Sequence, residues 1–539
     1  MDTLRADVWV IGSGAAGLMA AITARLDGAD VAVIGKSGPG KGTSTTFAVG
    51  AFAGPWDGVS DEAYRERVLT AGRGLNEREL VDIAAAEAPA RFQDLIDWGL
   101  TTKSAPGVFM ALPKDDPGDR IPVWGREIVR CMVAKAQAVG VRFVNNLVVR
   151  AIAAGEDGVC LRAYGARRRR WLELRGGAAI LAAGGAGALF LHHDNPKRMG
   201  GDSHALGYEA GCVMQDLEFV QFYPVAIAEP GKPVFVIEPD GADLGQLVNA
   251  AGEDILDKYD ITVRPAATHA RDALSQALFQ EIEEHDGAVY IDLTEVTKEA
   301  WSANPISATK WAYLDAKYDA WNRPLRIAPV AHFSGGGART DGHGATSVPG
   351  LYAAGEAAGG MHGANRMGGN ALTECLVFGR RAGKAATAFA EGRDQGVRAA
   401  AAAAQLETGE PRTDPATLRA DLSRIMWQYG GIRRDAEGLA TGLEKVRAIG
   451  AEAARTRGIN EPRVLEKFLE TQLAATAADL IIQAASHRQE SRGTHARADY
   501  PESDDEKWRG HLKVVRQADG PNWWFDALSE DDGKAVEIR

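Results

Sequence analysis

Residues 8–35 read VWVIGSGAAGLMAAITARLDGADVAVIG, and this segment decides the fold of the N-terminal region. An apolar run leads into a glycine-rich turn at 12–17, then into a helix-like segment and a second apolar run. Glycines at this spacing allow a tight strand-to-helix turn and let a pyrophosphate approach the N-terminus of the helix. The segment therefore predicts a dinucleotide-binding unit whose ligand would contact Gly12, Gly14, Ala15, Ala16 and Gly17.

The dinucleotide fingerprint is incomplete at the end of the second apolar run. An acidic residue commonly binds the ribose there, whereas this chain has Gly35 followed by Lys36. We expect Lys36 to lie near the adenosine end of the ligand, away from any reacting atoms.

The composition is that of an ordinary globular protein of two to four domains. The chain has 539 residues, of which 45% are apolar and 25% are charged. A net charge of -12 argues against binding to nucleic acid or to an anionic membrane. The sequence has no run of about 18 apolar residues and no recognisable signal peptide, so we expect no membrane span and a cytoplasmic location.

The four cysteines are too widely spaced to predict a metal site. Cys131, Cys160, Cys212 and Cys375 form no C-x-x-C pair. We therefore expect neither an iron–sulfur cluster nor a structural zinc site in this chain, and a reducing compartment.

A second glycine-rich region lies at 331–372. It begins AHFSGGGARTDG and ends GLYAAGEAAGGMHGANRMGGNAL. Together with the segment at 8–35 it resembles the flavoprotein-subunit family of succinate dehydrogenase, fumarate reductase and L-aspartate oxidase. The resemblance extends to GDSHALGYEAGCVMQDLEFVQFYP at 201–224, ATHARDALSQAL at 267–278 and ESRGTHARADYPE at 490–502.

The resemblance implies an α/β fold: a Rossmann-like FAD-binding domain with an inserted α+β capping domain and a C-terminal helical domain. Strand-like segments alternate with turns over 141–185, and we interpret the basic run 167–170 as a solvated hairpin turn instead of an anion-binding patch. Residues 398–415 are typical of a linker, and amphipathic helices follow. The expected divisions are 1–225 and 329–400 for the FAD-binding domain, 226–328 for the capping domain, 401–490 for the helical domain and 491–539 for a polar tail.

Members of this family exchange a hydride between flavin N5 and one substrate carbon, while an arginine exchanges a proton at the next carbon. By resemblance, that arginine is Arg271 and Glu238 returns its proton; the alternative for Arg271 is a surface salt bridge with Asp272. His332 and Arg366 match the residues that hold a substrate carboxylate, for which the planar guanidinium is suited. The remaining cofactor contacts expected by resemblance are Ser44, Thr45, Gly50, Ala183, Gly184, Asp202, Glu356, Asn370 and Leu372.

Four positions depart from the family pattern. Ser44 stands about where members with covalent flavin have a histidine, so we expect FAD to be bound non-covalently. Tyr223 replaces the histidine of the Q-F-H-P motif, which binds the second carboxylate. Ile237 replaces the threonine before the relay glutamate, and Gly241 replaces an arginine of the usual proton path.

These departures remove two donors from one end of the site and leave both carboxylate-binding residues at the other. Because leaving a carboxylate unpaired costs much free energy, we expect a substrate with one well-held carboxylate. Its other end would be an amide, ester, thioester or aromatic group.

The leading hypothesis is an FAD-dependent oxidoreductase acting on a carbon–carbon bond next to a carboxylate. Electrons would leave by a separate small iron–sulfur subunit or a soluble acceptor. The alternatives are an L-aspartate oxidase-like enzyme, succinate dehydrogenase or fumarate reductase proper, and a flavin electron-relay subunit without substrate chemistry. The sequence leaves open the substrate, the direction of reaction, the electron acceptor, the oligomeric state and whether a partner subunit is obligatory.

Overall fold

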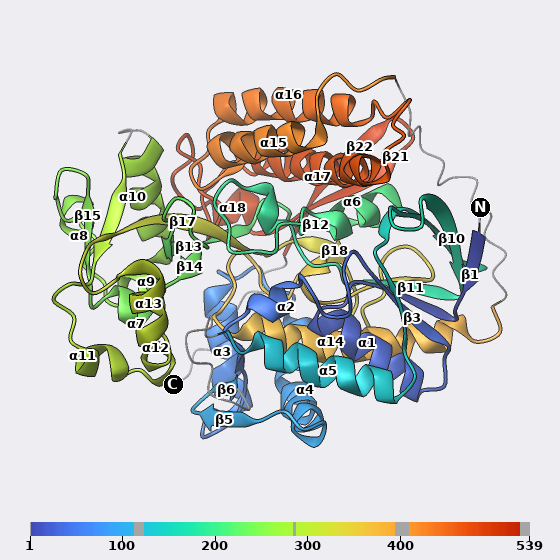
Figure 1. The fold of residues 1–539 in the computed structure, drawn as a ribbon, viewed down its shortest axis with the longest axis horizontal. Coiled ribbons are helices and arrows are strands. Elements are labelled where there is room, and N and C mark those ends of the chain that lie inside the picture. The colour runs from blue at the N-terminus through green and yellow to red at the C-terminus, as the bar shows by residue number, and fades with distance from the viewer. Residues whose placement is uncertain (1, 113–122, 284–286, 394–408, 529–539) are drawn as a thin grey trace.

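The computed structural model describes residues 2–112, 123–283, 287–393 and 409–528. Most of the linker expected at 398–415 lies outside these residues. Figure 1 shows three regions: a central α/β body, a lobe built from 220–334, and a layer of C-terminal helices.

The body is built on a parallel sheet that begins with the segment 8–35. Strand β2 (Val8–Ile11), helix α1 (Ala15–Leu26) and strand β3 (Val31–Gly35) follow one another as predicted. The strand order is β19-β11-β2-β3-β7, and every pairing is parallel. The other strands of this sheet are β7 (Arg142–Asn145), β11 (Ala178–Leu181) and β19 (Leu351–Ala353).

Alternation along β2 divides the body into two hydrophobic cores. Val8 and Val10 pack with helices α1, α5 (Gly125–Ala138) and α14 (Asn370–Ala390) on one face of the sheet. Trp9 and Ile11 face the other side, in a core shared with the antiparallel strands and the C-terminal helices. Both faces are buried because side chains of a strand alternate and this sheet is covered on each side. This doubly covered parallel sheet confirms the predicted α/β class.

Further elements complete the body. The antiparallel sheet β1-β10-β9-β8 places residues 166–169 in the turn between β9 and β10, which confirms the interpretation of the basic run. The bounds of these and the remaining body elements are β1 (Asp2–Arg5), β8 (Val148–Gly155), β9 (Gly158–Gly165), β10 (Arg170–Gly176), α2 (Ser44–Phe47), β4 (Ala51–Ala53), α3 (Asp61–Ala71), α4 (Arg78–Asp97), β5 (Thr102–Ala105), β6 (Val108–Ala111), α6 (Asp202–Glu209), β12 (Met214–Gln215), β18 (Gly337–Arg339) and β20 (Ala358–Gly359).

The lobe at the left of Figure 1 has its own core and forms the cap. Its sheet has the order β14-β13-β17-β16-β15. Strands β13 (Val220–Ile227) and β17 (Leu325–Ser334) run across the limits expected at 225/226 and 328/329, so that division remains our proposal. The other cap elements are β14 (Phe235–Val236), α7 (Pro239–Ala242), β15 (Gln246–Asn249), α8 (Ile255–Lys258), α9 (Ala266–His269), α10 (Arg271–Glu283), β16 (Val289–Asp292), α11 (Lys298–Ser302), α12 (Pro305–Ala308) and α13 (Trp311–Tyr318).

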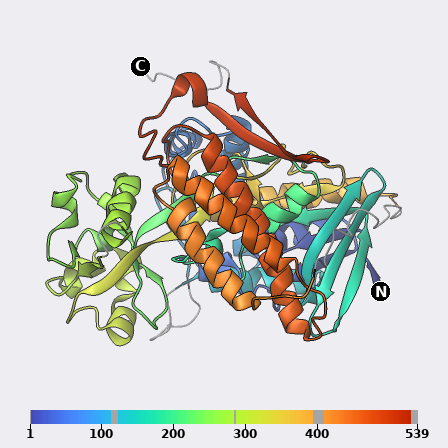
Figure 2. The same ribbon diagram turned by 90° about the horizontal axis from the view of Figure 1, so that it is seen from above.

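Three C-terminal helices lie across the body, as Figure 2 shows. Helix α15 (Pro415–Gly430) begins where the side chain of Asp414 accepts hydrogen bonds from the N–H groups of Ala416 and Thr417. Proline at the first helical position suits this start, because its missing N–H would have no intrahelical partner there. Helices α16 (Ala436–Ala453) and α17 (Pro462–His487) complete the layer and confirm the predicted helical region.

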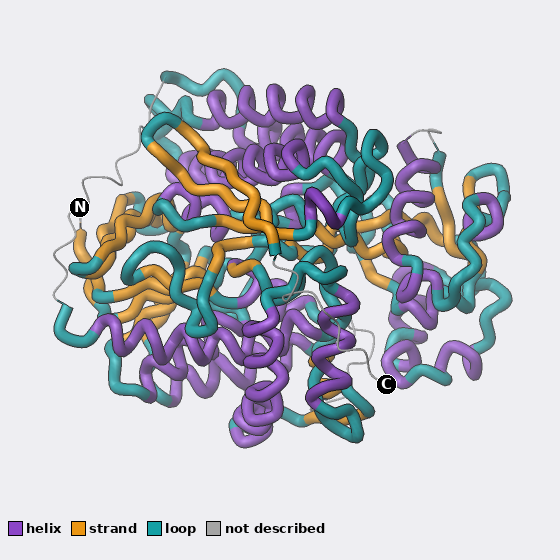
Figure 3. The backbone as a smooth tube through the Cα atoms, turned by 180° about the vertical axis from the view of Figure 1, so that it is seen from behind, coloured by secondary structure: helices purple, strands orange, loops and turns teal. Residues whose placement is uncertain are grey.

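The polar tail contains a β-hairpin that the sequence interpretation did not include. Strands β21 (Gly510–Gln517) and β22 (Gly520–Ala527) pair with each other, and β21 pairs with β12 of the body. A short helix, α18 (Asp505–Trp508), precedes the hairpin. The hairpin is visible from behind in Figure 3. Among the described residues, no helix is both long and apolar enough to cross a membrane.

Candidate active site

A cavity of about 280 Å³ lies at the carboxyl end of β2, where the nucleotide was expected. Its walls come from the glycine-rich turn, from the segment 34–47 and from residues 182–184 and 196–206. The predicted cofactor residues that line it are Gly12, Gly14, Ala15, Ala16, Lys36, Ser44, Thr45, Ala183, Gly184, Asp202 and Glu356.

The remaining four predicted cofactor residues lie behind the cavity wall or beside it. A Cβ atom on Gly17 would approach the carbonyl oxygen of Gly12 to 2.1 Å, so Gly17 closes the turn. Gly50 packs against Trp124 with φ of 91°. Asn370 and Leu372 lie in the first turn of α14, as expected, and are buried; the Asn370 side chain accepts a hydrogen bond from Tyr64.

Backbone geometry explains why the turn needs glycine at position 12. Gly12 has φ of 117°, and a Cβ atom there would lie 2.1 Å from the carbonyl oxygen of Ala182. Any side chain would push β11 away from β2 and close the cavity. The turn therefore leaves bare backbone at the N-terminus of α1, where a pyrophosphate can accept hydrogen bonds.

Lys36 is held in place by two carboxylates. Its ammonium lies 2.7 Å from Asp202 of α6 and 2.9 Å from Glu470 of α17. Burial disfavours the charge, but the two carboxylates outweigh it and raise the pKa of Lys36. This network joins the nucleotide cavity to the C-terminal helices.

Glu356 provides an ionisable group on the cavity wall. Its Oε1 accepts a hydrogen bond from the backbone N–H of Ser334 at 3.0 Å. Burial raises the pKa of this carboxyl to about 8, so it carries a proton at neutral pH and can donate a hydrogen bond to a ligand.

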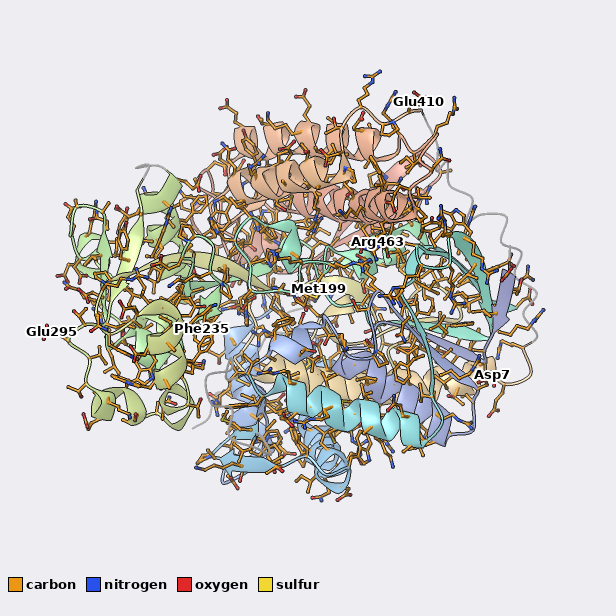
Figure 4. All side chains as sticks on the ribbon, in the orientation of Figure 1. Asp7, Met199, Phe235, Glu295, Glu410 and Arg463 are labelled. Carbon is orange, nitrogen blue, oxygen red and sulfur yellow. The ribbon has the colours of Figure 1, made fainter. Side chains whose placement is uncertain are left out.

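Ser44 lies on the opposite side of the cavity. Its hydroxyl donates to the sulfur of Met199 at 2.9 Å, and Figure 4 labels Met199 near the middle of the molecule. A bare glycine turn, a protonated carboxyl and an ammonium fit an FAD molecule, with Gly12, Glu356 and Lys36 among the residues that would hold it.

A second group of side chains collects where the cap meets the body. Arg366 is buried, and it donates to the side-chain oxygen of Gln221 at 3.0 Å and to the carbonyl oxygen of Met367 at 3.1 Å. Its Nε has no hydrogen-bond partner among the described residues. Burial lowers the pKa of Arg366 to about 10, and nearby Arg271 contributes to the shift. Two guanidinium groups this close create a site for an anion.

His332 points toward the same place from strand β17. Its Nδ1 lies 2.6 Å from the carboxylate of Asp194. Such a contact fixes the orientation of the imidazole ring and leaves Nε2 available for a ligand. Asp194 was not among the predicted site residues, although it closes the segment GALFLHHD next to a strand end.

Arg271 begins helix α10 and faces Tyr223. Its Nε donates to the carbonyl oxygen of Ala267 at 3.3 Å, and its guanidinium carbon lies 5.3 Å from the centre of the Tyr223 ring. Burial raises the pKa of the adjacent Asp272 to about 6, so that carboxyl is not an ordinary surface ion-pair partner.

Tyr223 connects the two sides of this group. Its ring centre lies 5.8 Å from that of His332, and its hydroxyl donates to the carbonyl oxygen of Ile237 at 2.9 Å. Pro224 lacks an N–H group, and the pairing of β13 with β17 shifts register between Tyr223 and Ala226. The structure thus brings together Arg271, Tyr223, His332 and Ile237.

Glu238, the predicted relay residue, caps the N-terminus of α7 and pairs with Lys310. Lys310 precedes α13 and was not predicted as a site residue. A single lysine in the segment SATKWAY gives no periodic signal, and only the folded cap places it beside Glu238.

Comparison with known proteins agrees with this geometry. The family described as "FAD binding domain" matches residues 7–372, and the family described as "Fumarate reductase flavoprotein C-term" matches residues 419–529. The chain is 30% identical to a fumarate reductase (CoM/CoB) of Methanothermobacter marburgensis, over 95% of this chain and 97% of that protein's matching chain. It is 31% identical to an L-aspartate oxidase of Streptomyces coelicolor, over 95% of this chain and 91% of that protein.

A solved structure matches over almost the full length. The FrdA chain of a mutant E. coli quinol fumarate reductase superimposes with a TM-score of 0.83 at 26% identity, covering 98% of this chain and 97% of that chain. The glycine turn, the cavity and these matches define a flavoprotein oxidoreductase. The chain belongs to the FAD-dependent family that contains fumarate reductase flavoproteins and L-aspartate oxidases.

Proposed function

We propose that this protein oxidises or reduces a carbon–carbon bond next to a carboxylate, in a substrate whose other end is not a small free carboxylate. One observation carries the proposal. His332 and Arg366 present donors to an anion at one end, whereas the Tyr223 hydroxyl at the other end is bound to the Ile237 carbonyl oxygen.

Each side chain has a defined task in this proposal. Arg366 and His332 bind the carboxylate and thereby fix which carbon faces the cofactor. Arg271 gives a proton to the neighbouring carbon, or removes one, and Glu238 restores the protonation state of Arg271. FAD, when bound, supplies the hydride chemistry. An arginine needs such a relay because its ordinary pKa is above about 12.

We propose that the FAD is bound non-covalently, because Ser44 offers a hydroxyl where an imidazole nucleophile would be needed. We also propose that electrons pass to a separate small iron–sulfur protein or to a soluble acceptor. The four cysteines contain no cluster-binding pair, and the described residues contain no group of three or more metal-ligating side chains.

An L-aspartate oxidase-like activity is the second candidate, and the likeness to an L-aspartate oxidase at 31% identity favours it. The Tyr223–Ile237 contact argues against it, because aspartate carries two carboxylates. Succinate dehydrogenase or fumarate reductase proper meets the same objection. A relay protein without substrate chemistry would not need Arg271, His332 and Arg366 to converge.

The proposal is tested by exposing the holoenzyme anaerobically to a panel of carboxylates. We expect saturated monoamides, monoesters or thioesters to bleach the oxidised flavin, or their unsaturated counterparts to reoxidise the dithionite-reduced flavin. Bleaching by aspartate, with peroxide released on admission of oxygen, would establish the second candidate instead. An unchanged spectrum throughout the panel would refute a role in substrate chemistry.

A further inference from the structure

The cap contains a buried ion pair between Lys310 and Glu238. The two side chains are only 3% and 12% exposed. The Lys310 ammonium also lies 5.1 Å from the centre of the Phe235 ring, which Figure 4 labels in the cap. Burying an ammonium and a carboxylate is costly, and replacing such a pair with apolar residues is often neutral or stabilising. The pair therefore calls for an explanation other than stability.

Helix α7 itself cannot supply the cation for Glu238. Gly241 lies one turn after Glu238, and a Cβ atom there would approach the Trp301 ring to 2.9 Å. Trp301 is fully buried and donates from its indole N–H to the carbonyl oxygen of Ser307 at 2.6 Å. This ring occupies the space that a side chain at 241 would need. The cation comes from Lys310, 72 residues away in sequence.

An open groove of about 410 Å³ reaches the same place from solvent. It is lined by α7 and by the segment 300–307, including Gly241, Trp301 and Ser307. The backbone N–H of Lys310 donates to the carbonyl oxygen of Ser307 at 2.9 Å, so the lysine begins directly behind the groove wall. On its other side, Glu238 keeps one oxygen, Oε2, without a hydrogen-bond partner among the described residues.

Glu238 also lies beside the residues of the active site. Its neighbour Ile237 accepts the hydrogen bond of Tyr223, and the Tyr223 ring lies against Arg271. The start of α9, which leads into Arg271, is tied to the end of α7 because Ala266 N–H donates to Asp243 at 3.1 Å. Glu238 therefore has Lys310 on one side and the Arg271 region on the other.

We propose that Lys310 carries protons between the solvent groove and Glu238, so that the proton relay of this chain runs through Lys310 and Glu238 to Arg271. This inference rests on the proposed function. In the reducing direction, Arg271 gives its proton to the substrate carbon and regains one from the Glu238 carboxyl. Glu238 regains a proton from the Lys310 ammonium, and the Lys310 amine takes one from water. One proton enters and one reaches the substrate; dehydrogenation reverses each transfer.

Electrostatics support this role. Burial lowers the pKa of Lys310 to about 7, so its charged and neutral forms are both accessible near neutral pH. Glu238 of α7 is the charged group in contact with it. The other titratable groups of the surrounding elements are turned elsewhere: Asp240 accepts from Asn304 at 2.7 Å, Tyr313 packs against Phe235, and Lys298 and Glu299 of α11 are exposed.

The test compares Lys310→Met, Lys310→Arg and Lys310→Ala holoenzymes with Lys317→Met, an exposed lysine on α13. We expect Lys310→Met to retain its flavin and its affinity for a substrate analogue, but to lose about 100-fold or more in turnover. Its rate profile should lose the ionisation near neutral pH. Ethylamine added to Lys310→Ala should restore part of the rate, and Lys317→Met should behave as the wild type.

Turnover of Lys310→Met within twofold of the wild type would overturn the inference, and so would an unaltered pH profile. If Lys310→Met fails to hold flavin, the pH profile of Lys310→Arg decides, because a guanidinium titrates far above pH 7. Failure of this inference alone would leave the Arg271→Gln enzyme inactive. Failure of the proposed function would leave even Arg271→Gln unimpaired, and the relay would fall with it.

Discussion

The hydroxyl of Tyr223 donates a hydrogen bond to the carbonyl oxygen of Ile237 at 2.9 Å. Two departures from the family pattern are therefore one contact, in which the tyrosine uses its donor on the backbone. A substrate reaching this end of the site would meet an aromatic ring and an aliphatic side chain. The carboxylate-binding side chains, His332 and Arg366, lie at the other end of the site.

Replacing both residues should create a second carboxylate site. In the double variant Tyr223→His and Ile237→Thr, we expect the preference for dicarboxylates over one-ended substrates to rise about 10- to 100-fold. A hydrogen bond to a charged group contributes about 1.5–3 kcal/mol, which corresponds to that range. The measurement is kcat/KM for both substrate types. Tyr223→Phe is the control, because it removes the hydroxyl without adding a donor; an equal gain in that variant would contradict the argument.

Removing the guanidinium at 271 should stop chemistry while leaving binding intact. We expect Arg271→Gln and Arg271→Lys to lose about 10²- to 10⁴-fold in kcat, the usual contribution of a positioned acid or base. Flavin content and binding of a substrate analogue, measured by absorbance, should be unchanged. Full activity in either variant would favour the electron-relay alternative.

The contact between Asp194 and His332 should affect binding more than chemistry. Asp194→Asn leaves the ring poorly oriented, and His332→Ala removes one donor to the carboxylate. We expect KM to rise about tenfold in the first variant and about 10- to 100-fold in the second, with smaller changes in kcat. His343→Ala, an exposed histidine, is the matched control. A pure loss of kcat would remove His332 from the binding role.

Flavin attachment has a direct readout. Denaturing the purified protein in acid should release all of its FAD into the supernatant, because Ser44 offers no imidazole. A flavin absorbance that stays with the precipitated chain would show a covalent link.

Glu356 should make the stability of the FAD-free protein depend on pH. Its folded carboxyl keeps its proton up to about pH 8, against an ordinary pKa of 4.5 in the unfolded chain. The stabilisation is fully present below pH 4.5 and is lost as the pH rises toward 8, by up to about 1.4 kcal/mol per pH unit. In Glu356→Gln, chemical denaturation should show a flatter dependence over this interval. Equal slopes would mean that Glu356 is ionised in the folded protein.

The parts of the fold that could be predicted are those with local signals. The segment 8–35 carries strand periodicity, a glycine turn and a helix in sequence order, and the structure has these elements in the same order. The hairpin β21–β22 was missed, although the dipeptide Asp519-Gly520 is a turn signal. Its place in the fold depends on pairing with Met214, about 300 residues earlier, which no local pattern encodes.

The same limit applies to the active site. Motif positions predicted Arg271, His332 and Arg366, because the residue types suit an anion and a proton transfer. The partners that orient them come from distant segments: Asp194 is 138 residues from His332, and Lys310 is 72 residues from Glu238. Such pairs are determined by tertiary packing, so the structure was needed to find them.

The substrate assignment is tested most directly by one ratio. The wild-type enzyme should be assayed, with an artificial electron mediator, on fumarate and succinate and on their monoamide and monoester derivatives, and kcat/KM compared pair by pair. We predict that the derivatives modified at one end exceed the free dicarboxylates by at least about tenfold. Equal or greater kcat/KM for the free dicarboxylates would contradict the account of a site with one carboxylate-binding end.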